Sequence, residues 1–150
     1  MAGSVWTIGY EQVTQAALVE CLGQASVEIL ADVRYLPLSR RPGFSKNSLR
    51  AAVEEAGIGY CHFRHLGTPS EGRAAARRGD LATLERIYSG QLELPEALAQ
   101  MAELRALAET SKAALLCYER RAAECHRNLL VTALFDDFEQ IDLEPELVRP

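Results

Sequence analysis

The sequence predicts a three-layer α/β domain, in which a mostly parallel β-sheet is covered by helices on both faces. Short β-branched and aromatic segments alternate with longer segments whose apolar residues recur at helical spacing, in the order β-α-β-α-β-α-α-β-α. The strand segments are also largely apolar along their length, which is typical of strands buried on both faces. Strands that alternate with helices along a chain favour parallel sheets.

The first half of the chain contains three predicted strands, Ser4–Tyr10, Val27–Val33 and Ile58–Phe63. The first predicted helix starts at Gln15 and ends near Gly23, with Thr14 as its N-cap residue. The second, Ser48–Ala56, is capped by Ser45 or Asn47 and stops at Gly57. The connection before it, YLPLSRRPGFSKNSL, contains two prolines, one glycine and three basic residues, so we expect a long irregular loop.

The second half begins with the polar segment Thr68–Arg78, which contains Gly72, is followed by Gly79 and is assigned to no helix or strand. The elements predicted after it are the helices Leu81–Tyr88, Leu94–Leu107 and Ala123–Phe138 and the strands Ala113–Cys117 and Gln140–Leu143. In the second of these helices one apolar stripe is expected to pack against the sheet, formed by Leu94, Leu98, Met101, Leu104 and Leu107. The same helix is able to form a dimer contact, but nothing in the sequence requires one. The sequence is therefore compatible with both a monomer and a homodimer.

The length of 150 residues suits one domain, with its core at about 4–138 and an acidic tail at about 139–150. A content of 48% hydrophobic and 25% charged residues is ordinary for a soluble globular protein. No apolar run approaches the roughly 18–20 residues that span a bilayer. No basic residue precedes an apolar segment at the N-terminus, so we expect no secretory signal, no membrane partner and a cytoplasmic location.

Positive charge is concentrated in the middle of the chain. The net charge is −5, yet residues 32–127 contain fifteen of the sixteen Lys and Arg residues. An acidic protein with a local excess of cations favours a small anionic ligand over duplex nucleic acid, for which a basic domain is expected.

Charged and polar residues follow the predicted strands at their carboxyl ends. They occur in Gly9-Tyr10, Asp32-Val33-Arg34, His62–His65 and Tyr118-Glu119. Ligands of open α/β sheets bind at this edge, near a switch point in strand order. We therefore predict that these residues converge on one composite site.

The ligand-binding candidates are mostly cations and hydroxyl-bearing residues, because arginine forks match phosphate and carboxylate oxygens. Asp32 either orients Arg34 toward a ligand or forms a local salt bridge with it, and the loop 40–46 either binds the anion or is merely solvated. The candidates are Tyr10, Asp32, Arg34, Ser39, Arg40, Lys46, His65 and Arg127.

The catalytic candidates Glu119, Cys125 and His126 lie in the segment 113–134. A thiol at a helix N-terminus near arginines has a lowered pKa, which permits rhodanese-like or phosphatase-like chemistry at Cys125. Such enzymes place their cysteine directly after the strand, where this chain has Cys117, and Glu119 would repel an anion. Packing is therefore the alternative role of Cys125, and an ion pair with Arg34 or Arg127 is the alternative for Glu119.

The sequence indicates neither a metal site nor a disulfide. The four cysteines have wide, uneven spacings without a CxxC motif, and no Cys, His or Glu pair has the spacing of a zinc finger. The motifs leave the identity of any cofactor unknown.

Four motifs together resemble a known family. TIGY, DVRYLPLSRRPGFSK, GIGYCHFRHLG and LLCYERRAAECHR occur in this order, and the chain resembles the bacterial and archaeal domain-of-unknown-function family numbered 488 from about Thr7 to Leu134. The resemblance implies a single-domain α/β protein without an established reaction. The matching motif positions are Gly9, Tyr10, Asp32, Arg34, Pro37, Ser39, Phe44, Leu66, Gly67, Cys117, Glu119, Cys125, His126 and Arg127.

The leading hypothesis is an enzyme or ligand-binding protein for a phosphorylated or nucleotide-like anion, which Arg34, Arg40 and Arg127 would hold while Glu119 and His126 serve as acid and base. The alternative is a module that binds single-stranded nucleic acid, with the loop 40–46 on phosphates and Phe44 or Tyr35 stacked on a base. In a third, purely structural reading the motif residues only brace one another in a buried ion network.

Overall fold

The computed structural model describes residues 3–148 and contains a five-stranded parallel sheet, so the predicted α/β class is confirmed. The strand order is β3-β2-β4-β1-β5. The strands are β1 (Ser4–Gly9), β2 (Ile29–Asp32), β3 (Gly59–His62), β4 (Ala113–Cys117) and β5 (Glu139–Leu143). The helices are α1 (Gln15–Gln24), α2 (Lys46–Glu55), α3 (Ser70–Arg77), α4 (Leu81–Leu92), α5 (Pro95–Thr110) and α6 (His126–Leu134), with the 3₁₀ turns η1 (Arg64–Leu66) and η2 (Ala122–Glu124).

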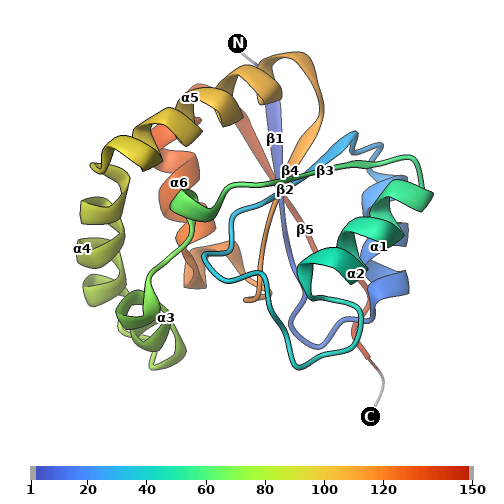
Figure 1. Ribbon diagram of the computed structural model, residues 1–150, viewed down its shortest axis with the longest axis horizontal. Helices are drawn as coiled ribbons and strands as arrows, with labels where there is room; N and C mark the ends of the chain where they lie inside the picture. Colours follow the sequence, from blue (N-terminus) through green and yellow to red (C-terminus); the bar gives the residue numbers. More distant parts are fainter. Residues whose placement is uncertain (1–2, 149–150) are drawn as a thin grey trace.

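Helices cover both faces of the sheet and enclose two apolar cores. Helices α1 and α2 lie on one side, and α4, α5 and α6 lie on the other (Figure 1). The central strand β4 contributes to both cores, because its side chains alternate between the two faces. Ala114 and Leu116 pack in the core beneath α1 and α2, and Ala113 and Leu115 pack in the core beneath α4, α5 and α6. This two-sided burial explains why β4 reads as a continuous apolar run.

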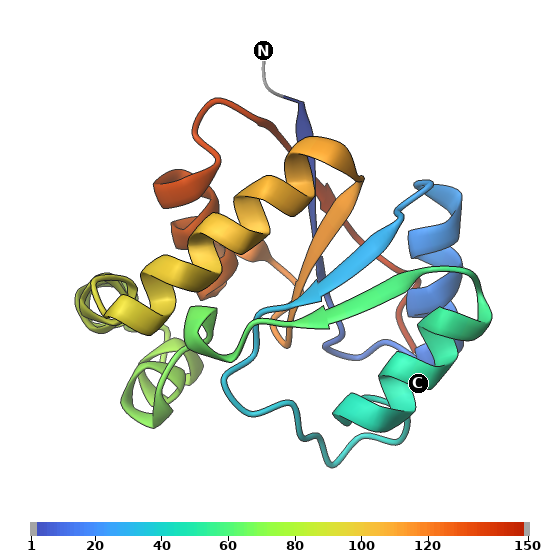
Figure 2. The ribbon, with the colours of Figure 1, turned by 45° about the horizontal axis from the view of Figure 1, so that its top comes forward.

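The chain leaves the neighbouring strands β1 and β4 toward opposite faces, with α1 following β1 and α6 following β4. This is a switch point, and a crevice forms at the carboxyl ends of such strands. The register pairs Gly9 with Cys117, and Asp32 with both Leu116 and His62. The turned view in Figure 2 shows the loop between β2 and α2 passing along this edge of the sheet.

The helices of the structure differ from the predicted ones in two regions. The segment 68–78 contains α3, which sequence reasoning missed because its buried positions are the small residues Gly72 and Ala75 rather than a stripe of large apolar side chains. The helix predicted over Ala123–Phe138 is divided, since η2 precedes Cys125 and α6 begins only at His126. The last strand lies within the segment 139–150 that the sequence marks as an acidic tail, and it pairs in parallel with β1.

The apolar stripe predicted for α5 was also partly wrong. Leu98 is 55% exposed and the N-cap residue Leu94 is 44% exposed. The helix buries Leu104 of the predicted stripe together with Ala97 and Ala108, which lie outside it.

We expect Leu104→Ala to lower the free energy of unfolding by about 2–5 kcal/mol, because it removes buried methyl groups and leaves a cavity. Leu98→Ala should change it by less than about 1 kcal/mol, because that side chain is already in contact with water. Urea denaturation measures both variants, and equal losses would contradict the observed helix orientation.

Among residues 3–148, no helix combines the length and the apolar character required to cross a membrane.

Candidate functional site

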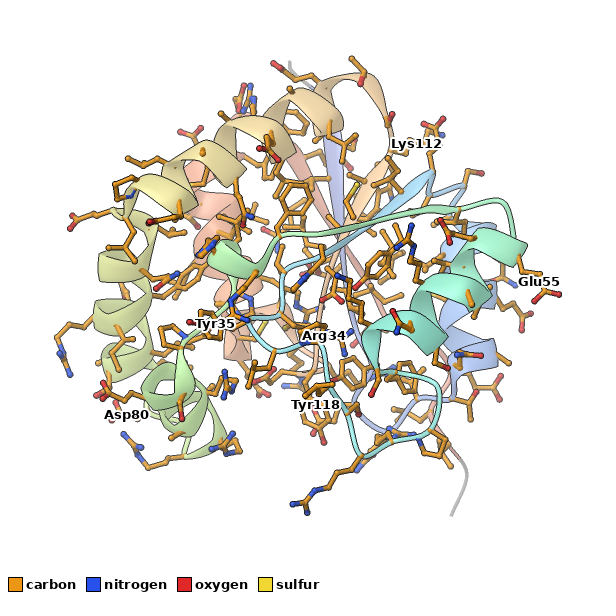
Figure 3. All side chains as sticks on the ribbon, in the orientation of Figure 1. Arg34, Tyr35, Glu55, Asp80, Lys112 and Tyr118 are labelled. Atoms are coloured by element: carbon orange, nitrogen blue, oxygen red, sulfur yellow. The ribbon has the colours of Figure 1, made fainter. Side chains whose placement is uncertain are left out.

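A cavity of about 550 Å³ lies at the carboxyl ends of the strands. It is bounded by the ends of β1, β2 and β4, by the loop after β2 and by α3 and α4. Figure 3 shows Arg34, Tyr35 and Tyr118 in this region, between α3 and α4 on one side and α2 on the other. The lining residues are Tyr10, Arg34, Tyr35, Leu36, Leu38, Arg40, Thr68, Arg73, Ala76, Arg77, Leu84, Cys117, Tyr118, Glu119 and His126.

One wall is braced by a buried ion pair between Asp32 and Arg34. The Arg34 guanidinium donates from Nε to Oδ1 at 2.8 Å and from Nη2 to Oδ2 at 2.7 Å, and its Nη1 donates to the Phe44 carbonyl at 2.6 Å. Burial lowers the pKa of Arg34, but the hydrogen bonds and the negative charge of Asp32 outweigh burial, so the pKa is raised. Tyr60 also donates to Asp32, and burial together with the Asp32 charge raises the pKa of Tyr60.

The structure therefore favours the local salt bridge among the two roles predicted for Asp32 and Arg34. All three guanidinium nitrogens of Arg34 donate to protein acceptors, and the bond to Phe44 ties the loop after β2 to the strand end. Arg34 still forms part of the cavity wall, where its positive charge acts at close range.

The turn after β4 packs directly on the end of β1. The Tyr10 amide donates to the Cys117 carbonyl at 3.3 Å, and the Glu11 amide donates to the Tyr118 carbonyl at 2.8 Å. Gly9 permits this approach, because a Cβ atom there would lie 1.9 Å from the Glu119 carbonyl oxygen. The Tyr10 ring then stacks on Phe44 with 4.7 Å between ring centroids.

Behind the cavity, Arg127 is fully buried and donates hydrogen bonds to the sulfur of Cys125. The Cys125 sulfur caps α6, accepting the Arg127 backbone N–H at 3.2 Å and its Nε–H at 3.0 Å. The Arg127 Nη2 donates to the main-chain carbonyl of Glu119, which links the helix to the β4 turn. Burial would raise the pKa of Cys125, but hydrogen bonding with Cys117, the charge of Arg127 and His126 hold that pKa well below its usual value.

The cavity floor contains Cys117, Glu119 and His126. The Cys117 thiol donates to Glu119 Oε2 at 3.7 Å, and burial raises the pKa of Cys117. Burial and the negative charge of Cys125 raise the pKa of Glu119. Burial disfavours the charged form of His126, but the contacts with Cys125 and the Val33 carbonyl outweigh it and raise the pKa of His126.

The structure brings together many of the predicted site residues, but not all. Tyr10, Arg34, Arg40, Glu119 and His126 line the cavity, and Asp32, Cys125 and Arg127 lie directly behind lining residues. The three predicted ligands Ser39, Lys46 and His65 do not line it. Ser39 instead forms hydrogen bonds within its own loop, where its backbone N–H donates to the Ser45 hydroxyl and its own hydroxyl accepts from the Arg41 backbone N–H.

Several predicted roles need correction. Arg127 is 0% exposed and donates to Cys125 and Glu119 rather than reaching into the cavity as an anion ligand. The Glu119 carboxylate contacts the Cys117 thiol, and no ion pair with Arg34 or Arg127 forms among the residues described. His126 Nε2 is engaged by the Val33 carbonyl at 2.7 Å, so this nitrogen is not free to exchange a proton with a substrate.

The site candidates predicted from the sequence did not include the lining thiol and three of the polar lining residues of the segment 68–78: Cys117, Thr68, Arg73 and Arg77. The rule that sites form at strand ends could have identified Cys117, which is the last residue of β4. The other three come from the segment that was not recognised as containing a helix, so no signal placed them near the sheet.

The fold and the cavity define a parallel α/β protein with an arginine-rich, thiol-containing site at the switch point of its sheet. The chain belongs to the family described as domain of unknown function DUF488, whose model matches residues 14–134, and this confirms the resemblance seen in the sequence motifs. No curated protein and no solved structure matches the chain significantly.

Proposed function

We propose that this protein is an enzyme that acts on a small phosphorylated, nucleotide-like anion in the cavity. The observation that carries the proposal is the arrangement of charge: Arg40, Arg73 and Arg77 line the same cavity as Glu119. A volume of about 550 Å³ falls in the range of about 300–1,000 Å³ that is typical of small-molecule sites.

The arginines have donors available for an anion. Arg40 and Arg77 are exposed, and neither forms an ion pair within residues 3–148. Arg73 uses Nη1 to donate to the Thr68 carbonyl at 3.1 Å, which orients its fork beside the cavity. The Thr68 hydroxyl is buried without a hydrogen-bond partner among the residues described, and burial of an unpaired polar group is costly unless a ligand or water pairs with it.

The remaining walls suit a flat apolar group beside the phosphate. Leu36, Leu38 and Leu84 line the cavity together with the rings of Tyr35 and Tyr118. Leu38 is 71% exposed and Tyr118 is 45% exposed, so both offer apolar surface that a ligand would cover. Such walls, combined with a few convergent polar groups, are the usual composition of a nucleotide-sized site.

Glu119 is the proposed proton carrier. Among the described residues that line the cavity it is the one carboxylate. It follows the last residue of β4 by two positions, and its hydrogen-bond partner is the Cys117 thiol. A carboxylate within hydrogen-bond reach of a bound substrate serves as a general acid or base. The single-strand alternative loses one of its two stacking candidates, because Phe44 is 0% exposed and stacked on Tyr10, and so is not available to a base.

Isothermal titration with adenosine monophosphate and inorganic phosphate tests the anion site. We expect the double variant Arg73→Ala, Arg77→Ala to bind adenosine monophosphate at least about tenfold more weakly, because charge-assisted hydrogen bonds contribute about 1.5–3 kcal/mol each. Arg86→Ala is the matched control, since this arginine is exposed on α4 and does not line the cavity. An equal loss in the control, or no binding by the wild type, would refute the anion site.

Turnover separates an enzyme from a binding protein. In a screen of phosphorylated compounds, the wild type should convert at least one of them, and Glu119→Gln should abolish the conversion while preserving the affinity for the same compound. Conversion that survives in the variant would remove Glu119 from its proposed role.

A further inference from the structure

We infer that Cys117, Cys125 and His126 form a binding site for a divalent transition-metal ion, most suitably Zn²⁺. This inference goes beyond the proposed function and does not depend on anion binding at the arginines. It also reverses the expectation from the sequence, in which no pair of ligands had a recognisable spacing.

The three side chains offer the right atoms at close range. Their ligand atoms, two sulfurs and one imidazole nitrogen, all lie within 4.8 Å of one another, and all three residues are buried. Zinc binds thiolate at about 2.3 Å and imidazole at about 2.0–2.1 Å, so donors around a tetrahedral ion lie about 3.5–4 Å apart. The observed upper bound of 4.8 Å is therefore about 1 Å above the donor spacing around a bound ion.

The histidine is oriented for coordination. A carbonyl oxygen can only accept a hydrogen bond, so the 2.7 Å contact between His126 Nε2 and the Val33 carbonyl requires a proton on Nε2. In the neutral ring the lone pair is then on Nδ1. Histidines that bind metals commonly donate their other N–H to a backbone carbonyl in this way, because that bond sets the tautomer and the ring orientation.

The sulfur of Cys125 is also held as a metal thiolate would be. It accepts two N–H groups from Arg127, and a thiolate retains lone-pair density for an ion beyond these bonds. Arg127 thereby supports the ligand from outside the coordination sphere, which is the role of the groups that surround most metal ligands.

The fourth position would face the cavity. Cys117 and His126 are both ligands in this proposal and lining residues of the cavity, and Glu119 lies 3.7 Å from the Cys117 sulfur. Three protein ligands with one open position are typical of catalytic rather than structural zinc. The spacing of these three ligands in the sequence resembles no known metal motif, because Cys117 comes from the end of β4 whereas Cys125 and His126 come from the start of α6.

Metal analysis of the full-length protein, purified under reducing conditions and then incubated with Zn²⁺ or Co²⁺ alone, tests the inference. We expect one equivalent of metal and, with Co²⁺, a thiolate-to-cobalt charge-transfer band together with the visible absorption of a tetrahedral site. Cys117→Ser and His126→Gln should weaken Co²⁺ binding by more than the roughly 10–100-fold that loss of an outer partner costs.

Cys61→Ser and Cys21→Ser are the matched controls, because both residues are half-buried cysteines outside the cluster and these variants should keep the full metal content. The wild-type cobalt spectrum reports thiolate ligation even if a ligand variant fails to fold. Uptake well below one equivalent, a cobalt spectrum without the charge-transfer band, or unchanged affinity in folded Cys117→Ser would overturn the inference. Recovery of a Cys117–Cys125 disulfide from the reduced preparation would overturn it as well.

Discussion

The variant Asp32→Asn is expected to lose about 3–5 kcal/mol of unfolding free energy, which is the usual cost of removing one partner from a buried ion pair. Asp32 is 0% exposed and accepts hydrogen bonds from both the side chain and the backbone N–H of Arg34. Without the carboxylate, the Arg34 guanidinium stays buried with no counter-charge of its own. Chemical denaturation monitored by circular dichroism measures the loss.

The double variant Asp32→Asn, Arg34→Met separates charge from shape. Because it removes both charges, it should be more stable than Asp32→Asn alone, even though the Phe44 carbonyl loses its donor. If the double variant is the less stable of the two, the unpaired arginine is not the cause of the unfolding free energy lost in Asp32→Asn.

Gly9→Ala should destabilise the protein by about 3 kcal/mol, toward the upper end of the usual cost of overpacking, because the added methyl group meets backbone rather than a flexible side chain. Its Cβ atom would lie 1.9 Å from the Glu119 carbonyl oxygen and 2.6 Å from the carbonyl carbon. The turn after β4 must then move, and the bond from Arg127 to this carbonyl is lost with it. Thermal and urea unfolding give the stability, and metal uptake reports the state of the site.

Gly23→Ala is the matched glycine control. Gly23 lies in α1, and outside its chain neighbours and the backbone of that helix no atom lies within 4 Å of a Cβ built there, so alanine should be neutral or stabilising by up to about 1 kcal/mol. Similar losses in the two variants would show that Gly9 does not serve the contact between β1 and the β4 turn.

The elements that could be predicted are those whose burial repeats along the chain. The strand Ala113–Cys117 was predicted with its observed bounds, because burial on both faces leaves an uninterrupted apolar run. The helix α1 was found from the spacing of Leu18 and Leu22 and from the Thr14 hydroxyl, which accepts the Ala17 amide as an N-cap. Helix α3 was missed, because a helix that buries glycine and alanine has no such pattern.

By itself, the sequence determined the α/β class, the family and the principle that polar residues gather at the carboxyl ends of the strands. These properties follow from local periodicity and from the direction of strands in a parallel sheet. Only the tertiary structure decided which polar groups face a ligand and which face each other. Arg127 was expected in the cavity, yet it is buried against Cys125, while Arg73 and Arg77 of α3 line the cavity instead. The partners of Arg127 lie close to it in the sequence, but whether its side chain turns toward them or toward the cavity depends on how α6 packs on the sheet. Arg73 and Arg77 reach the cavity only through the position of α3, which no spacing within a motif specifies.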